Sequence, residues 1–296
     1  MRLHIVGCGR VGRALARLWV EHGTLSIGWV LNRRIASARH AVAFIGAGTA
    51  TDRPLEIDPD DWLMLAAPDG ALAGLAEALA QSLPSTPALA FHVSGAESAR
   101  VLAPLRCPVA SVHPVRPFSD PAAAAAQFEG TLALGEGDDA ALERVLPVFT
   151  AIGARSSRFQ PGDKRLYHAA AIASSNFLNV LDQLALALAE SAGLEHRQAL
   201  DLIVSLQRAA LENIAAVGPA PSLTGPIERG DSEMCRRLAG ILADAPGDRH
   251  GVLPALARAA VDLADTKHSR PPGSNPLVAL FEPVSSAESG IADGRV

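Results

Sequence analysis

The stretch Gly7-Cys8-Gly9-Arg10-Val11-Gly12 stands between an apolar segment, residues 2–6, and an amphipathic segment, residues 13–20. The first segment predicts a short buried strand and the second predicts a helix. Glycines spaced G-x-G-x-x-G at such a strand-to-helix turn are typical of a dinucleotide-binding fold. They permit a tight turn, a close approach of the backbone to a pyrophosphate and tight helix packing, while the helix N-terminus offers N–H groups to the anion. We therefore predict a nucleotide site here; the alternative is a glycine-rich turn without a ligand.

The segment after the second predicted strand, residues 25–31, indicates which nucleotide is bound. In NAD-binding proteins an acidic residue about 20 positions beyond the glycines bonds the ribose hydroxyls. Here that position is Asn32, followed by Arg33 and Arg34, with Ser37 nearby. Guanidinium groups bind phosphate through paired donors, so this segment suits the 2′-phosphate of NADP(H). The alternative is that both arginines are simply solvated at the end of a strand.

Composition limits the class of protein. The chain has 296 residues, which is enough for two domains, and 49% of them are hydrophobic. The formal net charge of -5 and the lack of a basic block argue against nucleic-acid binding. Cys8, Cys107 and Cys235 fit neither a disulfide framework nor a zinc site, so no metal is expected and a reducing, cytoplasmic location fits. No segment approaches ~18 uninterrupted apolar residues, so no membrane span is expected.

Strand and helix patterns alternate up to about residue 152 and then give way to helices. We expect strands at 42–45, 62–67, 88–93, 109–112 and 131–134, with helices at 71–81 and 139–150. This alternation predicts an α/β fold with a doubly wound, mostly parallel sheet, followed by an all-helical domain. The helices expected there span 163–192, 195–217, 232–243 and 253–267. The predicted domains are therefore 1–152, which binds the dinucleotide, and 153–267, followed by a loose tail at 268–296.

Polar residues follow several predicted strands of the first domain. Pro68 and Asp69 end one strand, His92 and Ser94 end the next, and His113 ends a third. Ala67 and Pro68 are also predicted to bind the cofactor. Such ends converge on one crevice in a parallel sheet. A histidine can transfer a proton near neutral pH and a serine can orient it or the substrate, so we predict a catalytic role for Ser94 and His113. The alternative is that each simply terminates its strand.

Two further features belong to the helical region. At 100° per residue, the long helix carries a polar stripe, which we expect to face a cleft rather than solvent; it comprises Lys164, His168, Ser175, Asn179 and Asp182, with Asn176 at its side. His168 is the candidate general acid, Asn176 a second catalytic candidate, and Asn179 a substrate-binding candidate. Thr224 and Arg229 lie in a rigid Thr-Gly-Pro turn and its continuation, where Arg229 either binds a substrate carboxylate or pairs with Asp231.

These motifs together resemble one bacterial family, which joins a Rossmann-like domain to a C-terminal domain of unknown function, DUF2520. The resemblance spans residues 1–267 and rests on the glycine fingerprint and four later motifs: His92-Val93-Ser94-Gly95, His113-Pro114, Tyr167-His168-Ala169-Ala170 with Ser175-Asn176, and Thr224-Gly225-Pro226 with Arg229-Gly230-Asp231. It implies a 6-phosphogluconate-dehydrogenase-like helical domain, homodimers and NADP-dependent or F420-dependent oxidoreduction. Reduction of ketopantoate is one activity that it implies.

Two more distant families share part of these motifs, and the chain departs from each of them at one position. Ser94 and His113-Pro114 resemble prephenate dehydrogenases, although Val115 replaces their methionine. The β-hydroxyacid dehydrogenases carry a lysine four residues before an asparagine, where this chain has Ile172. We therefore expect an NADPH-dependent reductase of a small 2-oxo or imino acid, with His168 or His113 donating the proton. The alternatives are a prephenate-type dehydrogenase and a regulatory protein that binds NADP(H) without turnover.

Overall fold

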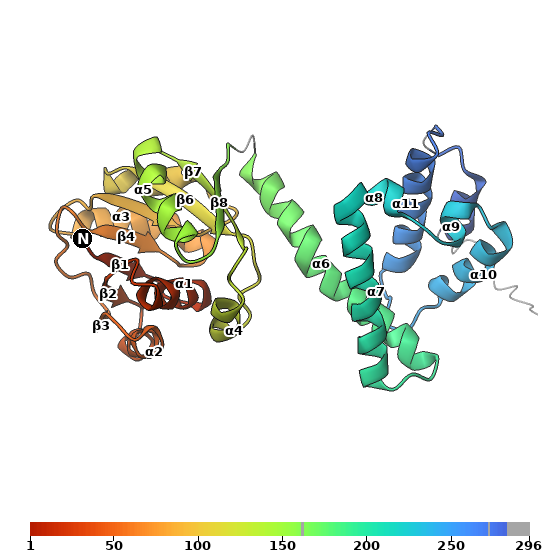
Figure 1. The fold of residues 1–296 in the computed structure, drawn as a ribbon, viewed down its shortest axis with the longest axis horizontal. Coiled ribbons are helices and arrows are strands. Elements are labelled where there is room, and N and C mark those ends of the chain that lie inside the picture. Colours follow the sequence, from red (N-terminus) through yellow and green to blue (C-terminus); the bar gives the residue numbers. More distant parts are fainter. Residues whose placement is uncertain (161–162, 272, 283–296) are drawn as a thin grey trace, which may run out of the picture. The chain divides into compact units, whose positions relative to one another are not determined.

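The computed structural model describes residues 1–160, 163–271 and 273–282. The chain divides into two compact units, Met1–Ser175 and Asn176–Val296 (Figure 1). The division falls within the longest helix, α6 (Lys164–Ser191). The first unit therefore extends beyond the predicted boundary at residue 152, because a further strand and the first half of α6 belong to it.

The first unit contains an eight-stranded sheet in the order β3-β2-β1-β4-β5-β6-β7-β8. Strands β1 to β6 pair in parallel, β7 is antiparallel to β6, and β8 is parallel to β7. This confirms the predicted doubly wound, mostly parallel sheet. The strands are β1 (Leu3–Val6), β2 (Ile27–Leu31), β3 (Thr49–Thr51), β4 (Trp62–Leu65), β5 (Leu89–His92), β6 (Val109–Pro114), β7 (Leu132–Gly137) and β8 (Arg155–Arg158).

Helices cover both faces of the sheet, and a separate core lies under each. One core joins α1 and α5 to the sheet, where Trp19 of α1 packs edge-on against Phe91 and Phe149. The other core joins α3 and the 3₁₀ helix η2 to the opposite face. The helices of this unit are α1 (Arg10–Glu21), α2 (Ile35–Ile45), η1 (Asp69–Ala71), α3 (Leu72–Ser82), η2 (Ala99–Leu105), α4 (Pro121–Ala126) and α5 (Asp139–Thr150).

The strand predicted at 42–45 is wrong, because these residues end helix α2. Ala38, Ala41 and Ile45 are buried at helical spacing, so the period of the whole segment outweighs the β-branched residues at its end. The edge strands β3 and β8 were not predicted. Their sequences, Thr-Ala-Thr and Arg-Ser-Ser-Arg, lack the apolar pattern of buried strands.

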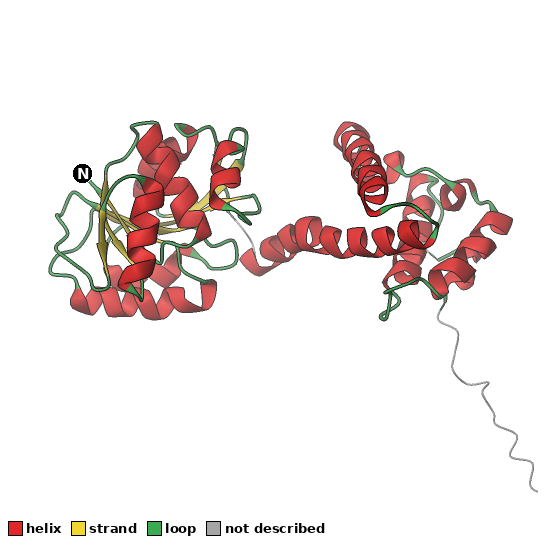
Figure 2. Cartoon of the chain, turned by 90° about the horizontal axis from the view of Figure 1, so that it is seen from below, coloured by secondary structure: helices red, strands yellow, loops and turns green. Residues whose placement is uncertain are grey.

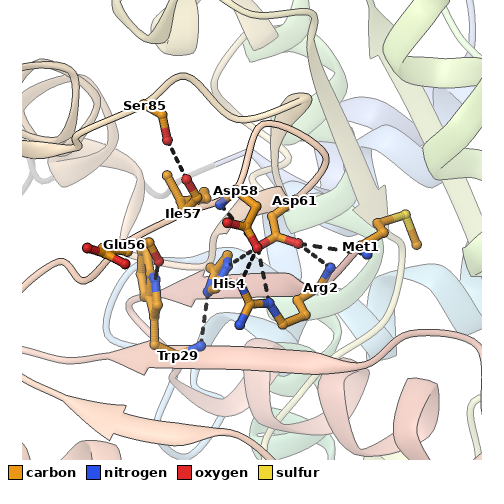
Figure 3. A network of polar contacts seen from close by, with 9 residues as sticks. All are labelled: Met1, Arg2, His4, Trp29, Glu56, Ile57, Asp58, Asp61 and Ser85. Carbon is orange, nitrogen blue, oxygen red and sulfur yellow. Dashed lines mark hydrogen bonds and ion pairs between the residues drawn. The ribbon is translucent and has the colours of Figure 1, made fainter.

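A polar network fastens the amino end of β1 to the segment before β4 (Figure 3). His4 and Asp61 are both 1% exposed, and His4 Nε2 lies 2.9 Å from Asp61 Oδ2. His4 Nδ1 accepts the Trp29 N–H at 3.0 Å, so Nε2 carries the proton and donates to Asp61. Arg2 donates to the same carboxylate from its backbone N–H at 2.6 Å and from its guanidinium at 3.0 Å. This buried pair is therefore saturated with partners, and we assign it a structural role.

The second unit consists of helices in its described residues (Figure 2). After α6 come α7 (His196–Val217), α8 (Pro219–Ser222), α9 (Pro226–Arg229), α10 (Ser232–Ala243), α11 (Val252–Lys267) and the 3₁₀ helix η3 (Pro276–Phe281). The predicted loose tail is wrong for its first part, because Leu277 and Phe281 of η3 are buried against α10 and α11. The rest of that tail, residues 283–296, lies outside the described residues.

Among the described helices, α6 has the length and mean hydropathy that a membrane span needs. One such helix is weak evidence, because core helices of globular proteins meet the same criterion.

Candidate functional site

The glycine fingerprint forms the turn between β1 and α1. Gly7 has φ +77°, and a Cβ there would lie 2.8 Å from Ala67 Cβ. A Cβ on Gly12 would lie 3.0 Å from Ala66 Cβ, so this glycine lets α1 pack against the loop after β4. Around Gly9 only the Gly7 carbonyl comes within 4 Å of such an atom, and no side-chain hydrogen bond caps α1. The backbone at the α1 N-terminus is therefore open to an anion.

A cavity of about 530 Å³ lies at this turn, at the carboxyl ends of β1, β2 and β4. Of the twelve residues predicted to bind cofactor, nine line it: Gly7, Cys8, Gly9, Asn32, Arg33, Arg34, Ser37, Ala67 and Pro68. Arg10, Val11 and Gly12 do not line it, because they form the first turn of α1. Arg13 and His40 line it as well and were not predicted. The adjacent Cys8 thiol is buried, and burial raises its pKa to about 12, so it is not a nucleophile at neutral pH.

The end of β2 gives the cavity its charge. Asn32 occupies the place of the expected carboxylate, and its backbone N–H donates to the Thr51 carbonyl at 3.2 Å. Arg33 and Arg34 are exposed beside it, and Arg34 directly precedes α2. Ser37 lies in the first turn of α2. Two guanidinium groups, a hydroxyl and the positive end of a helix dipole thus meet at one place, which suits a phosphate and not a ribose hydroxyl pair.

A second group of polar residues lies at the carboxyl ends of β5 and β6, beside the first turns of α6. Lys164 is 9% exposed, and its Nζ donates to Ser111 Oγ at 2.5 Å and to Glu136 Oε1 at 3.1 Å. Burial lowers the pKa of Lys164, while Glu136 opposes that shift. Ser111 Oγ donates to the Ser94 carbonyl at 3.2 Å, which links the lysine to the loop after β5. The two strand ends and α6 therefore share one hydrogen-bonded cluster.

His113 lies beside this cluster and faces the side chain of Tyr167. Its Nδ1 lies 2.6 Å from the Tyr167 hydroxyl of α6, and the two rings meet edge to face. The imidazole covers Gly95, where a Cβ would come within 2.9 Å of the ring. Burial and the charges of Lys164 and His168 lower the pKa of His113 to about 4. His113 is therefore neutral at pH 7.

The other predicted catalytic residues differ in what they contact. Ser94 Oγ accepts the backbone N–H groups of Ala96 and Glu97 at 3.0 and 2.9 Å, so it shapes its own loop. His92 is buried, with Nδ1 accepting the Ser94 N–H and Nε2 facing the Ser98 carbonyl at 3.2 Å. His168 is half-buried, and its Nδ1 has no hydrogen-bond partner among the described residues. His168 thus keeps a buried polar atom that a ligand could satisfy.

The site residues predicted in the second unit lie on α6 and near α9. Asn176 and Asn179 are exposed on α6, and Thr224 and Arg229 are exposed near α9. In the predicted turn, it is Glu228 that forms ion pairs, with Lys267 at 3.0 Å and His268 at 3.2 Å. Asp231 accepts the Met234 N–H and caps α10. The roles assigned to Asn176, Asn179, Thr224 and Arg229 stay predictions.

Three residues of the candidate site were missed from the sequence: Ser111, Glu136 and Tyr167. Ser111 and Glu136 lie inside strands, where a single polar residue gives no periodic signal. Tyr167 is the only tyrosine of the chain and opens the motif that contains His168, but the sequence analysis assigned it no role. In the described part of the chain, no group of three or more His, Cys, Asp or Glu side chains could hold a metal ion.

Two family models match the chain. Residues 1–114 match a Rossmann-like domain and residues 131–250 match a domain of unknown function, DUF2520. No curated protein sequence matches it.

Solved structures extend the likeness over most of the chain. Protein TM1727 from Thermotoga maritima is 25% identical, with a TM-score of 0.68 over 90% of this chain and 99% of that chain. BF3122 from Bacteroides fragilis, provisionally described as an NADP oxidoreductase, is 20% identical, with a TM-score of 0.68 over 91% and 98%. A reductive aminase from Aspergillus terreus, in complex with NADPH and ethyl levulinate, is 18% identical, with a TM-score of 0.61 over 95% and 98%. The likenesses to BF3122 and to the reductive aminase establish a shared fold.

Proposed function

We propose that this chain, which belongs to the family joining a Rossmann-like domain to a DUF2520 domain, is an NADPH-dependent reductase of small 2-oxo or imino acids. The observation that carries the proposal is the cavity at the glycine turn, where Asn32, Arg33 and Arg34 replace an acidic residue. A carboxylate there would repel a 2′-phosphate, whereas the two guanidinium groups attract it. The open N-terminus of α1 fits the pyrophosphate.

The polar cluster supports a reaction beyond nucleotide binding. NADPH would supply a hydride, so the protein must supply a proton to the reduced oxygen or nitrogen. Neutral His113, the half-buried Tyr167 and the unsatisfied Nδ1 of His168 are the candidates that hold a proton there. The Aspergillus reductive aminase, the Streptomyces aurantiacus imine reductase and the Coxiella pyrroline-5-carboxylate reductase share the fold, which favours a C=O or C=N substrate. Ketopantoate is the first specific substrate that we propose.

The test is oxidation of NADPH, followed by nicotinamide absorbance, with a panel of 2-oxo acids headed by ketopantoate and with cyclic imino acids. NADH is measured in parallel. We expect turnover with NADPH to exceed turnover with NADH. The double variant Arg33→Ala/Arg34→Ala should weaken NADPH binding by about tenfold or more and leave NADH binding nearly unchanged, since each lost charged contact costs roughly 1.5–3 kcal/mol.

Arg39→Ala is the matched control, because Arg39 is exposed on α2, the helix directly after Arg33 and Arg34, but does not line the cavity. Equal loss of NADPH and NADH binding in the double variant would contradict the 2′-phosphate site. NADPH binding without turnover of any acid or imine would favour the regulatory protein, and NADP⁺ reduction by prephenate would favour the prephenate-type dehydrogenase.

A further inference from the structure

We propose that Tyr167 is the proton donor of this reduction and that neutral His113 donates a hydrogen bond from Nδ1–H to the phenolic oxygen. The inference rests on the proposed reductase function for its substrate. It assigns a catalytic role to a residue that the sequence analysis gave no role, and it gives His113 the role of a positioning residue that acts through Tyr167.

The geometry fixes the two side chains against each other. The Tyr167 hydroxyl and His113 Nδ1 are 2.6 Å apart, and the ring planes are 88° apart. Phe159 packs against the Tyr167 ring with centroids 4.9 Å apart, and the His113 imidazole lies against Gly95. Both rings are half-buried, so packing holds the pair while part of each side chain stays accessible to solvent. A phenol held in this way keeps its hydroxyl group in one position, which a general acid requires.

The charges around His113 favour a neutral imidazole. Lys164 of α6 and His168 of the same helix disfavour its protonation, and only Asp69, after β4, acts in the opposite sense. With burial added, the pKa of His113 falls to about 4. A neutral imidazole has a single N–H, and placing it on Nδ1 leaves the Tyr167 proton free to point away from His113. The opposite tautomer would point that proton at His113 and away from a substrate.

The proton transfer balances without a further reactant. As the substrate carbon receives the hydride, the new O–H or N–H bond forms with the Tyr167 proton, and the phenolic O–H bond breaks. Tyr167 becomes a tyrosinate, which the His113 Nδ1–H stabilises. Water returns a proton to Tyr167 once the product has left. Burial raises the pKa of Tyr167, so the phenol stays protonated until this step.

Two neighbouring titratable groups, Lys164 and His92, are already engaged. Lys164 Nζ donates to both Ser111 and Glu136. Both nitrogens of His92 face backbone groups of its own loop. Tyr167, by contrast, has a hydroxyl proton that the Nδ1–H tautomer of His113 leaves available.

The first test is nitrogen NMR of the full-length protein labelled at histidine, near pH 7 and without substrate. Substitution His113→Asn identifies the His113 signals by their loss, and His196→Phe, an exposed histidine on α7, is the matched control that removes a different set. We expect a neutral His113 with its proton on Nδ1. A proton on Nε2 would overturn the proposed hydrogen bond whatever the activity.

The second test uses Tyr167→Phe, which keeps the ring that packs on Phe159. We expect kcat to fall by about 10²-fold or more while NADPH affinity stays unchanged, which is the effect of removing a general acid. Unchanged kcat would overturn the donor role. If the unaltered protein turns over no 2-oxo or imino acid at all, the reductase function and the donor role fail together, whereas the NMR result decides the His113–Tyr167 hydrogen bond separately.

Discussion

Three histidines of the first unit, His4, His92 and His113, are held in the neutral form by burial. The pKa of His92 falls to about 4 because burial and the Lys164 charge both disfavour protonation. An unfolded chain would protonate the same side chain below about pH 6.5. The unfolded state therefore binds more protons in acid, and the stability that neutral His92 contributes is lost as the pH falls from about 6.5 to 4.

This predicts that the free energy of unfolding falls by about 2 kcal/mol for His92, and by as much for His113, between pH 7 and pH 5. Urea unfolding at the two pH values measures the loss. His92→Gln, whose amide does not titrate, should show a smaller difference between them than the unaltered protein. An identical pH dependence in the two proteins would contradict a neutral buried His92.

Asp61 is the second residue whose environment makes a prediction. Burial alone would raise its pKa, but hydrogen bonds from His4 and Arg2 outweigh burial and lower it to about 2 (Figure 3). Asp61→Asn removes the charge and leaves His4 and Arg2 with a poorer acceptor. We expect a loss of about 3 kcal/mol in the free energy of unfolding, at the low end for a broken buried pair because Arg2 can still reach solvent.

Denaturant unfolding checks this loss, and Asp60→Asn is its control, since Asp60 is the exposed neighbour in the same loop. Equal effects of the two substitutions would show that the buried network contributes nothing specific.

At the scale of elements, the turn between β1 and α1 depends on the backbone of Gly7. Gly7→Ala places a Cβ 2.8 Å from Ala67 Cβ at φ +77°, which strains the turn and moves the α1 N-terminus. We expect NADPH affinity to fall by about tenfold or more, measured by fluorescence titration. In Gly74→Ala, within α3, the added Cβ meets no atom within 4 Å and should stabilise the fold by about 1 kcal/mol. Unimpaired NADPH binding by Gly7→Ala would contradict the role of this turn.

The elements that the sequence predicts well are those whose burial is periodic. Helix α5 and helix α10 begin and end at the predicted residues, because their apolar residues recur at helical spacing. Helix α2 was mistaken in part for a strand, since its small alanines carry the helical period only weakly. The edge strand β8 pairs along one side alone, so tertiary pairing and not composition makes it a strand.

In the candidate site, too, the residues of local motifs could be predicted and the contacts between distant segments could not. The glycine turn and Arg33 could be predicted because each lies in a short segment whose own residues indicate its role. The contact of His113 with Tyr167 could not be predicted, because it joins side chains of β6 and α6 that are 54 positions apart in the sequence. Ser94 has a polar side chain at a strand end, as predicted, but its contacts show that a strand end can require such a residue for its own turn.

At the scale of the whole molecule, the second unit exposes several large apolar side chains on α7. On α7 the exposed fractions reach 63% for Leu206, 58% for Leu211 and 44% for Leu202. Leu202 and Leu206 are one helical turn apart, and neighbouring exposed apolar side chains of this kind mark protein interfaces. We expect a second copy of the chain to cover this helix, because the charges on one of its faces are self-complementary.

Arg197, Asp201, Arg208 and Glu212 recur along one face of α7, and Val204 and Ser205 lie between them. Two α7 helices that pair antiparallel about the point between Val204 and Ser205 would bring Asp201 opposite Arg208 and Arg197 opposite Glu212, each pair twice by symmetry.

Arg208→Glu would turn the central attractions into repulsions, so we expect it to weaken the dimer. Adding Asp201→Arg restores opposite charges and should restore the dimer, as a charge swap does at complementary interfaces. Sedimentation at several protein concentrations measures the dissociation constant, and Arg39→Glu, which makes the same charge change on α2, is the control. A monomeric unaltered protein would exclude the interface, and failure of the double variant to recover would exclude this register of the two helices.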